Sequence, residues 1–223
     1  MERVNFDLFW SMRSPYCYLA LDRLIEARER FDLEIKVRVV YPLAIKQPDF
    51  FKVRASKHYR SYNLLDTKRW SEHLNISFRR PVPDPIVQDL STGVVADEQP
   101  YIYRLTRIAE LATQNNKGME FLDQVVRTLW DGETDNWHEG DHLLKAMERA
   151  GLDGKLLLEQ VDQDADQIDA AIRVHEAAQE QADHSGTPLM VLDGEPFFGQ
   201  DRIDLLLWRL KQNGLREKKT AGR

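Results

Sequence analysis

Strand-forming segments stand near both ends of this 223-residue chain, and a long helical stretch lies between them. Apolar residues fill every second position from Val4 to Trp10, which is the period of a strand with one face on a core. A helical apolar period follows from Cys17 to Arg28, and alternation returns from Ile35 to Tyr41. This order predicts a β-α-β unit at the N-terminal end.

A β-β-α unit is predicted at the other end of the chain. Two apolar runs, Leu189 to Leu192 and Pro196 to Phe198, flank Asp193-Gly194, a pair that favours the tight turn of a β-hairpin. Asp201 is expected to cap the last helix, which Asn213-Gly214 ends. The buried stripe of that helix is expected to consist of Ile203, Leu206, Leu207 and Leu210.

Between these units, from Pro48 to about His184, the pattern is helical and polar, with a proline-rich loop at residues 78–87. Helical runs are expected at residues 104–114, 119–130, 142–149 and 166–182. Two strand-bearing halves that share one sheet, with an all-helical insertion between them, predict an α/β fold of the thioredoxin type. The thioredoxin-like domain is expected at residues 1–47 and 185–215, the helical insertion domain at 48–184, and a frayed basic tail at 216–223.

The composition argues against several classes of protein. A net charge of −6, from 31 basic and 37 acidic residues, does not favour a nucleic-acid-binding protein, which needs a basic face. The longest apolar runs are far shorter than the roughly 18 to 20 residues that span a bilayer. Because the N-terminus enters a strand pattern at once, without a basic and apolar leader, we expect a soluble cytoplasmic protein.

Cys17 is the sole cysteine, so the chain has no internal disulfide, and thiol chemistry must use the sulfur of a ligand or partner. Cys17 shares the apolar helical face of Leu21 and Leu24, which indicates a small core residue rather than a redox group. No metal site is expected, because His138 and His142 lack a third ligand.

Ser14-Pro15 marks the start of the first helix. Serine can accept hydrogen bonds from the free amides of a helix N-terminus, and proline is pre-set for the first helical position. The same end of a helix carries about half a positive charge, so it also stabilises a bound anion. On these residues alone, an ordinary helix cap is the simpler interpretation.

Three stretches together give the chain a resemblance to known proteins: SPYCYLALDRL from Ser14, KHYRSYNLLDTKRWSEHLNISFRRPVPDP from Lys57, and GTPLMVLDGEPFFGQDRIDLLLWRL from Gly186. In this order and spacing they resemble the 2-hydroxychromene-2-carboxylate isomerases and the kappa-class glutathione transferases. These families share a DsbA-like thioredoxin fold with a helical insertion, as do the DsbA-type disulfide oxidoreductases. The resemblance spans almost the whole chain, so it implies the same fold here.

The resemblance implies glutathione as the cofactor and Ser14 as the catalytic residue. In DsbA-type proteins the first cysteine of a Cys-x-x-Cys motif begins the first helix, and here Ser14 takes that position while Cys17 takes the second. A serine hydroxyl does not ionise near neutral pH, so Ser14 would donate a hydrogen bond to the thiolate of glutathione. Thr187-Pro188 matches the cis peptide bond of thioredoxin folds, and Thr187 would pair with the cysteinyl backbone.

Further contacts follow from the same resemblance. The run Phe198-Gly199-Gln200-Asp201 matches the segment that receives the γ-glutamyl end of glutathione, where Asp201 would match its ammonium group. Tyr16 and Lys46 are expected to bind substrate. The family usually has a Gly-Asn pair after this lysine, whereas Lys46 is followed by Gln47-Pro48, so the site departs from the family pattern there.

The activity that the resemblance implies is a glutathione-dependent cis–trans isomerisation of the 2-hydroxychromene-2-carboxylate isomerase type, on an aromatic-derived acid in the degradation of aromatic compounds. The thiolate would add reversibly to a conjugated double bond, rotation would follow, and elimination would restore the double bond. Three alternatives stay open: a kappa-like transferase or peroxidase, a thiol–disulfide oxidoreductase that uses Cys17, and a ligand-binding protein without catalysis. The family resemblance also implies a homodimer.

Overall fold

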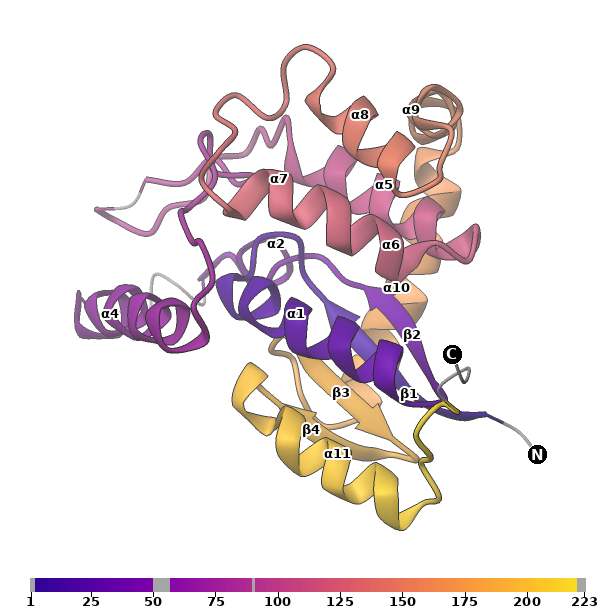
Figure 1. Cartoon of the computed structure of the whole chain (residues 1–223). Helices are drawn as coiled ribbons and strands as arrows, with labels where there is room; N and C mark the ends of the chain where they lie inside the picture. The colour runs from indigo at the N-terminus through magenta and orange to yellow at the C-terminus, as the bar shows by residue number, and fades with distance from the viewer. Residues whose placement is uncertain (1–2, 50–56, 90, 220–223) are drawn as a thin grey trace.

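The computed structural model describes residues 3–49, 57–89 and 91–219. Its strands are β1 (Val4–Trp10), β2 (Leu33–Val39), β3 (Leu189–Leu192) and β4 (Glu195–Phe198). They form one sheet in the order β2-β1-β3-β4 (Figure 1). β1 pairs in parallel with β2, whereas β1 with β3 and β3 with β4 pair antiparallel. The predicted union of the two chain ends in one sheet is confirmed, as is the thioredoxin-like fold with its helical insertion.

β1 lies inside the sheet, which explains why it is apolar on both faces. Phe6, Leu8 and Trp10 are buried on one side, as their spacing predicts. Phe9 is buried on the other side, because helix α10 (Ala165–Gln181) covers that face, behind the sheet in Figure 1. The cluster on this second face consists of Phe9, Val40, Ala182 and Leu189.

Two helices cover the front face of the sheet in Figure 1, namely α1 (Pro15–Arg30) and α11 (Ile203–Gln212). Ser14 caps α1 and Pro15 takes its first position, as predicted. The helix buries the face that carries Cys17, so its apolar stripe packs on the sheet.

The start of α11 differs from the prediction that Asp201 caps it. A short 3-10 turn, Gln200–Arg202, precedes the helix, and Arg202 occupies the N-cap position without a side-chain hydrogen bond. The turn begins at Gly199, whose φ of 103° is a conformation that glycine adopts readily. Asp201 therefore lies inside the turn. Of the predicted stripe, Ile203, Leu206 and Leu210 are buried, and Leu207 is partly buried.

The hairpin of β3 and β4 forms as predicted around Asp193-Gly194. Leu192 pairs with Glu195, so the connection has two residues. The φ angles of Asp193 and Gly194 are 51° and 85°, which is the conformation of a type I′ turn. Aspartate and glycine tolerate these positive angles, which is why this pair directs the chain back on itself.

The helices between β2 and β3 follow the predicted runs closely. The run at 119–130 is continuous, and a π-helical stretch, Leu122–Val126, joins two α-helical pieces. Residues 78–86 lie in a loop, as predicted. Three helices, Leu43–Lys46, Lys57–Leu74 and Gly154–Gln163, are not among the predicted runs. The helices are α2 (Leu43–Lys46), α4 (Lys57–Leu74), α5 (Ile102–Gln114), α6 (Gly118–Phe121), α7 (Arg127–Trp130), α8 (His142–Arg149), α9 (Gly154–Gln163) and α10.

One hydrophobic core joins the sheet and α1 to the helices α5 to α10. α10 also binds the end of β2 directly, since His175 Nδ1 lies 3.2 Å from Val39 O and the Glu176 carboxylate accepts from the Tyr41 N–H at 3.1 Å. The residues assigned to the insertion therefore complete the second face of the sheet. The thioredoxin-like and helical segments that the sequence separates at residues 47 and 185 therefore share one core.

The segment after α11 is held beside β2, which corrects the prediction of a frayed tail. The Asp32 N–H donates to Arg216 O at 2.9 Å. The Arg30 guanidinium lies 2.6 Å from the Glu217 carboxylate. The tail is thus attached at Arg216 and Glu217, and residues 220–223 lie outside the described residues.

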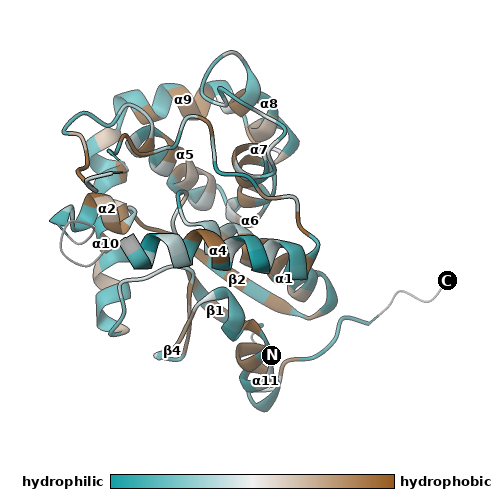
Figure 2. Ribbon diagram, turned by 90° about the vertical axis from the view of Figure 1, so that its left-hand side faces the viewer, coloured by the Kyte–Doolittle hydropathy of each residue, from teal (hydrophilic) through white to brown (hydrophobic). Residues whose placement is uncertain are grey.

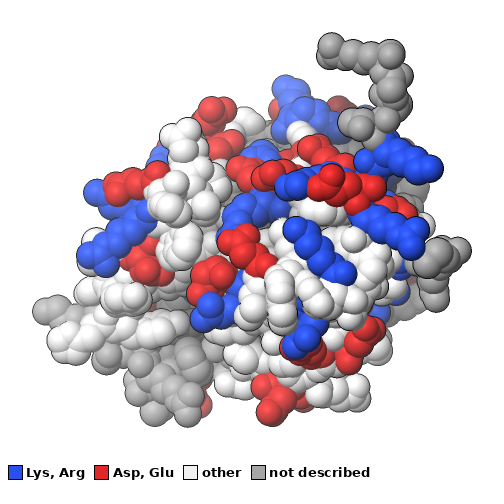
Figure 3. Space-filling model, turned by 60° about the horizontal axis from the view of Figure 1, so that its bottom comes forward, with Lys and Arg blue, Asp and Glu red and all other residues white. Residues whose placement is uncertain are grey.

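Charges of both signs are interspersed on the face that Figure 3 shows, which comes forward from the bottom of Figure 1. Ion pairs connect α11 to its neighbours: Arg23 with Asp204 at 2.8 Å, and Arg209 with Glu195 at 2.9 Å. Such ion pairs near the surface contribute little to the stability of the fold, typically up to about 1 kcal/mol each.

Within residues 3–49, 57–89 and 91–219, no helix has the length and apolar character needed to cross a bilayer.

Replacing Leu21 by alanine should lower the free energy of unfolding by about 2–5 kcal/mol, because Leu21 is fully buried and truncation leaves a cavity. Leu205→Ala is the matched control, since this leucine also lies on a helix but is 48% exposed, and its effect should stay within about 0.5 kcal/mol. Urea unfolding measures both values. Similar losses in the two variants would contradict the assignment of α1 to the core.

Candidate functional site

A pocket of about 770 Å³ opens where the start of α1, the loop before β3, and helices α2 and α4 meet. Its size falls within the roughly 300–1,000 Å³ typical of small-molecule sites. Helix α4 lies across α1 at the front of Figure 2 and supplies one wall of the pocket. The predicted site residues that line the pocket are Ser14, Tyr16, Thr187 and Phe198.

The Ser14 side chain joins the first helix to the loop before β3. Its Oγ accepts a hydrogen bond from the Cys17 N–H at 3.3 Å and donates one to the Thr187 O at 3.2 Å. The first bond caps α1, and the second connects residues that are 173 positions apart in sequence. Ser14 therefore lies at a helix N-terminus inside a pocket, where the sequence predicts it.

The peptide bond between Thr187 and Pro188 is cis, as predicted. Thr187 lines the pocket, whereas Pro188 is buried, and its backbone O accepts a hydrogen bond from the Gly199 N–H at 3.0 Å. In the described part of the chain, the backbone N–H groups of Tyr16 and Thr187 have no hydrogen-bond partner. Because both residues line the pocket, these amides are available to a ligand.

Cys17 is fully buried in the core and does not line the pocket. Burial raises the pKa of its thiol from an ordinary value of 9.0 to about 11, although hydrogen bonds with Ser11, Ser14 and Thr187 oppose the shift. The thiol is therefore protonated at neutral pH. The interpretation of Cys17 as a core residue is confirmed.

Tyr16 lines the pocket and connects α1 to α4. Its hydroxyl donates to the Asp66 carboxylate at 2.7 Å. Burial raises the pKa of Tyr16 well above its usual value of 10.0, and the bond to Asp66 raises it further. The phenol is therefore neutral, and its hydrogen is directed at α4.

His184 lines the same pocket, and sequence reasoning missed it. Its Nδ1 accepts a hydrogen bond from the Gly186 N–H at 2.9 Å, so the neutral ring carries its hydrogen on Nε2. Burial lowers the pKa of His184, which favours this neutral form. The ring packs against Phe198 with centroids 4.0 Å apart, and a Cβ at Gly186 would lie only 2.5 Å from the Phe198 ring. A glycine at 186 lets the two rings form a wall of the pocket.

Gly199, Gln200 and Asp201 do not line the pocket, although the resemblance places them in a glutathione site. The 3-10 turn directs this segment toward α1, where the Gln200 O accepts from the Arg23 guanidinium at 2.9 Å. Gln200 is buried, and Asp201 is exposed. Only the first residue of the predicted run, Phe198, reaches the pocket among the described residues.

Lys46 also lies apart from the pocket lining, which corrects the expectation of a substrate contact. Its ammonium group donates to the Gln179 side chain of α10 at 2.8 Å. Burial lowers the pKa of Lys46, although carboxylates of α10 oppose the shift. Lys46 therefore connects α2 to α10, and α2 contributes Leu43 and Ala44 to the pocket instead.

Three arginines that line the pocket were also missed, namely Arg13, Arg60 and Arg80. The position of Arg13 directly before Ser14 is the one local signal in the sequence. Arg60 and Arg80 carry no such signal, because α4 and the loop after it bring them to the pocket from distant parts of the chain. Their charge makes this wall of the pocket positive.

No group of three or more His, Cys, Asp or Glu side chains in the described residues is arranged to hold a metal ion. The His138 ring packs against Tyr101, with centroids 4.6 Å apart. His142 begins α8. The pocket lining includes serine, tyrosine, histidine and arginine side chains.

Alkylation of Cys17 by iodoacetamide tests the buried thiol. A pKa near 11 in place of 9.0 lowers the thiolate fraction at neutral pH about 100-fold, and burial blocks access as well. We expect native protein to react at least that much more slowly than urea-unfolded protein. Because the folded pKa is the higher one, stability should also fall as pH rises from about 9 to 11, and Cys17→Ala should lessen that fall. Rapid modification of native protein would contradict the buried assignment.

Comparison with solved structures supports this fold. A 2-hydroxychromene-2-carboxylate isomerase matches with a TM-score of 0.72 and 18% identity, over 94% of this chain and 96% of that one. A probable DsbA oxidoreductase from Streptomyces coelicolor matches with a TM-score of 0.67 and 17% identity, over 98% and 92%. The cytosolic disulfide reductase DsbM from Pseudomonas aeruginosa with GSH matches with a TM-score of 0.57 and 16% identity, over 93% and 100%. At such identities the likeness shows the fold alone.

No curated protein matches this chain by sequence. The family model of the DSBA-like thioredoxin domain matches residues 5–211, which is nearly the whole chain. The matched range contains strands β2 to β4, nearly all of β1, and the cis peptide bond before Pro188. The chain therefore belongs to the family of DSBA-like thioredoxin-domain proteins.

Proposed function

We propose that this protein is a glutathione-dependent isomerase of the 2-hydroxychromene-2-carboxylate isomerase type, acting on the double bond of a conjugated, aromatic-derived acid. The observation that carries the proposal is a pocket at the N-terminus of α1 that Ser14, Tyr16 and Thr187 line and Cys17 does not. The only thiol of the chain is buried, so a reactive sulfur at this place must belong to a ligand. The isomerase of similar structure supports the proposal at the level of the fold.

The donor groups of the pocket fit glutathione. Its cysteinyl backbone carries a carbonyl oxygen, which the free N–H of Thr187 would bind, and its sulfur would be held by Ser14 and the N–H of Tyr16. Phe198 would contact the γ-glutamyl end. When bound, glutathione supplies a thiolate that can add reversibly to a conjugated double bond.

Ser14 would act as a hydrogen-bond donor. Its hydroxyl has one hydrogen, which binds Thr187 O in the free protein, and rotation about the C–O bond can redirect it to an anion in the pocket. The bond from the Cys17 N–H to Oγ holds the oxygen in place during that change. The serine can thus stabilise a thiolate without moving its own backbone.

The helix adds an electrostatic contribution. A free thiol has a pKa near 8.5, so only a few per cent is ionised at neutral pH, and each unit of depression corresponds to about 1.4 kcal/mol. The N-terminus of α1, a helix of 16 residues, carries roughly half a positive charge beside Ser14. The Arg13 guanidinium, adjacent in sequence, lines the same pocket. These positive groups favour the thiolate over the thiol.

Tyr16 and His184 complete the pocket as neutral polar groups. The Tyr16 hydrogen is directed at Asp66, which leaves the phenol oxygen to accept a hydrogen bond from a ligand. The neutral ring of His184 keeps a donor on Nε2. We infer that they orient substrate, and that neither group competes with the thiolate for the positive end of α1.

A kappa-like glutathione transferase is the second candidate, since the same thiolate could attack an electrophile and leave as a conjugate. Product analysis with a conjugated acid and a known amount of glutathione separates the two. An isomerase leaves the glutathione unconsumed, whereas a transferase depletes it in proportion to product. A disulfide oxidoreductase that uses Cys17 is disfavoured by the burial of that thiol.

The homodimer, the aromatic-derived substrate and the cytoplasmic location that the sequence indicates stay predictions. Sedimentation of the purified protein tests the homodimer directly.

Calorimetric titration with glutathione tests the proposed role of Ser14. Loss of a hydrogen bond to a charged group corresponds to about 1.5–3 kcal/mol, so Ser14→Ala should bind glutathione roughly 10- to 100-fold more weakly than wild type. It should also lose about 1 kcal/mol of stability, because the helix cap is removed.

Ser71→Ala is the control for that experiment. Ser71 is a buried serine whose hydroxyl bonds to Lys68 O within α4, and it does not line the pocket. Its affinity for glutathione should match that of wild type. The absence of binding heat in wild-type protein, or equal affinities in wild type and Ser14→Ala, would contradict the proposed function.

A further inference from the structure

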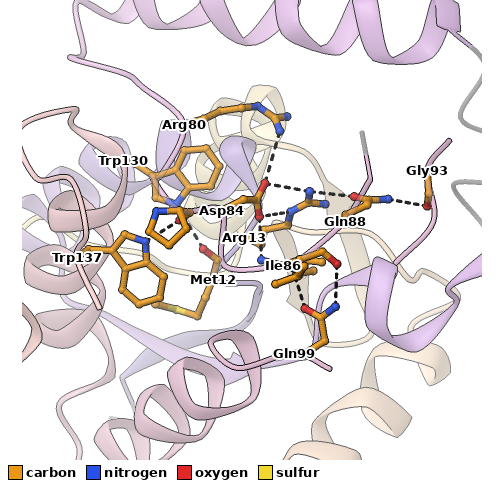
Figure 4. A network of polar contacts seen from close by, with 12 residues as sticks. Met12, Arg13, Arg80, Asp84, Ile86, Gln88, Gly93, Gln99, Trp130 and Trp137 are labelled. Carbon is orange, nitrogen blue, oxygen red and sulfur yellow. Dashed lines mark hydrogen bonds and ion pairs between the residues drawn. The ribbon is translucent and has the colours of Figure 1, made fainter. Parts of the chain in front are cut away.

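The wall of the pocket beside Ser14 holds the guanidinium groups of Arg13, Arg60 and Arg80, and no Asp or Glu of the described residues lines the pocket. Arg13 Nε and Nη2 donate to the two oxygens of Asp84 at 2.9 and 3.0 Å (Figure 4). Arg80 Nη1 approaches the same carboxylate only to 3.9 Å. Arg13 therefore binds Asp84 in the bidentate manner, and Arg80 makes only a long ion pair with the same carboxylate.

Asp84 has little capacity left for Arg80. Its Oδ1 also accepts the Ile86 N–H at 2.9 Å, so that oxygen has two donors. Arg13 is fixed further by Gln88 Oε1 at 3.0 Å, and Gln88 in turn donates to Gly93 O at 2.9 Å (Figure 4). This network fixes Arg13 and Asp84 and leaves the Arg80 guanidinium facing the pocket with donors to spare.

Positive charge exceeds negative charge on this wall. Burial, together with the charges of Arg13 and Arg60, lowers the pKa of Arg80, while Asp84 opposes the shift. Arg60 forms no ion pair within the described residues. Arg13 and Arg80 thus share Asp84, and no Asp or Glu of the described residues lines the pocket beside the three arginines.

We propose that Arg80, with Arg13 and Arg60 beside it, forms a subsite that binds a carboxylate group of the ligand in this pocket. The inference rests on the proposed function and deepens it, because it assigns the residues that would hold a carboxylate of the bound molecule. A planar guanidinium matches the two oxygens of a carboxylate better than other side chains do. Since Arg13 directly precedes Ser14, an acid held here lies next to the proposed thiolate position.

The carboxylate has two possible sources, the conjugated substrate or the glycine end of glutathione. Two pairs of probes separate them in calorimetric titrations at low salt: cinnamate against cinnamamide, and glutathione against its glycine monoethyl ester. Each pair differs mainly by one negative charge. In wild type, at least one charged probe should bind about tenfold or more tightly than its neutral partner.

Arg80→Gln should abolish that preference, and Arg80→Lys should retain part of it, because lysine keeps the charge without the planar fork. Arg79→Gln is the matched control. Arg79 pairs with Asp135 at 2.5 Å and does not line the pocket, so its removal changes the net charge equally and should leave the preference intact. If Arg80→Gln fails to fold, Arg80→Lys carries the test.

Charge preference that is absent in wild type, or unchanged in both Arg80 variants, would overturn the subsite. Preference within the cinnamate pair assigns the arginines to substrate, and preference within the glutathione pair assigns them to the cofactor. If glutathione gives no heat but the Arg80-dependent preference for cinnamate persists, the proposed function fails and the carboxylate subsite stands.

Discussion

The hydrogen bond from the Ser14 hydroxyl to the Thr187 backbone oxygen depends on the sheet that brings the two ends of the chain together. β1 ends beside the start of β3, because the two strands are antiparallel and Phe9 pairs with Leu189. The turn after β1 and the loop before β3 therefore meet at one edge of the sheet. A single hydrogen bond contributes only about 1 kcal/mol, so the buried strand pair, and not the bond, holds the two segments in place. The pocket exists because that edge has helix α4 on one side and the His184–Phe198 wall on another.

The same arrangement explains why Ser14 and Cys17 have different roles. Both belong to the first turn of α1, yet their side chains lie in different environments, since one lines the pocket and the other is buried. Burial in an apolar core disfavours a thiolate, whereas a helix N-terminus with free amides favours one. The chain thus provides an anion-stabilising position and no sulfur to occupy it. The proposed use of a ligand thiol follows from this separation.

The sequence predicts what depends on local pattern. Apolar alternation at Val4–Trp10, the Asp193-Gly194 turn and the Ser14-Pro15 helix start are each determined by neighbours in the chain, and the structure confirms them. Lys46 and Asp201 were misplaced, because their directions depend on packing against α10 and on the turn after Gly199. The positive wall could not be predicted, since its arginines come from three separate segments that only the fold brings together.

A crystal structure of the protein with glutathione tests the central claim most directly. The account predicts the cysteinyl sulfur within hydrogen-bonding distance of Ser14 Oγ and the Tyr16 N–H, with the cysteinyl backbone bound to Thr187. Glutathione bound elsewhere, or with its sulfur directed away from the start of α1, would contradict it.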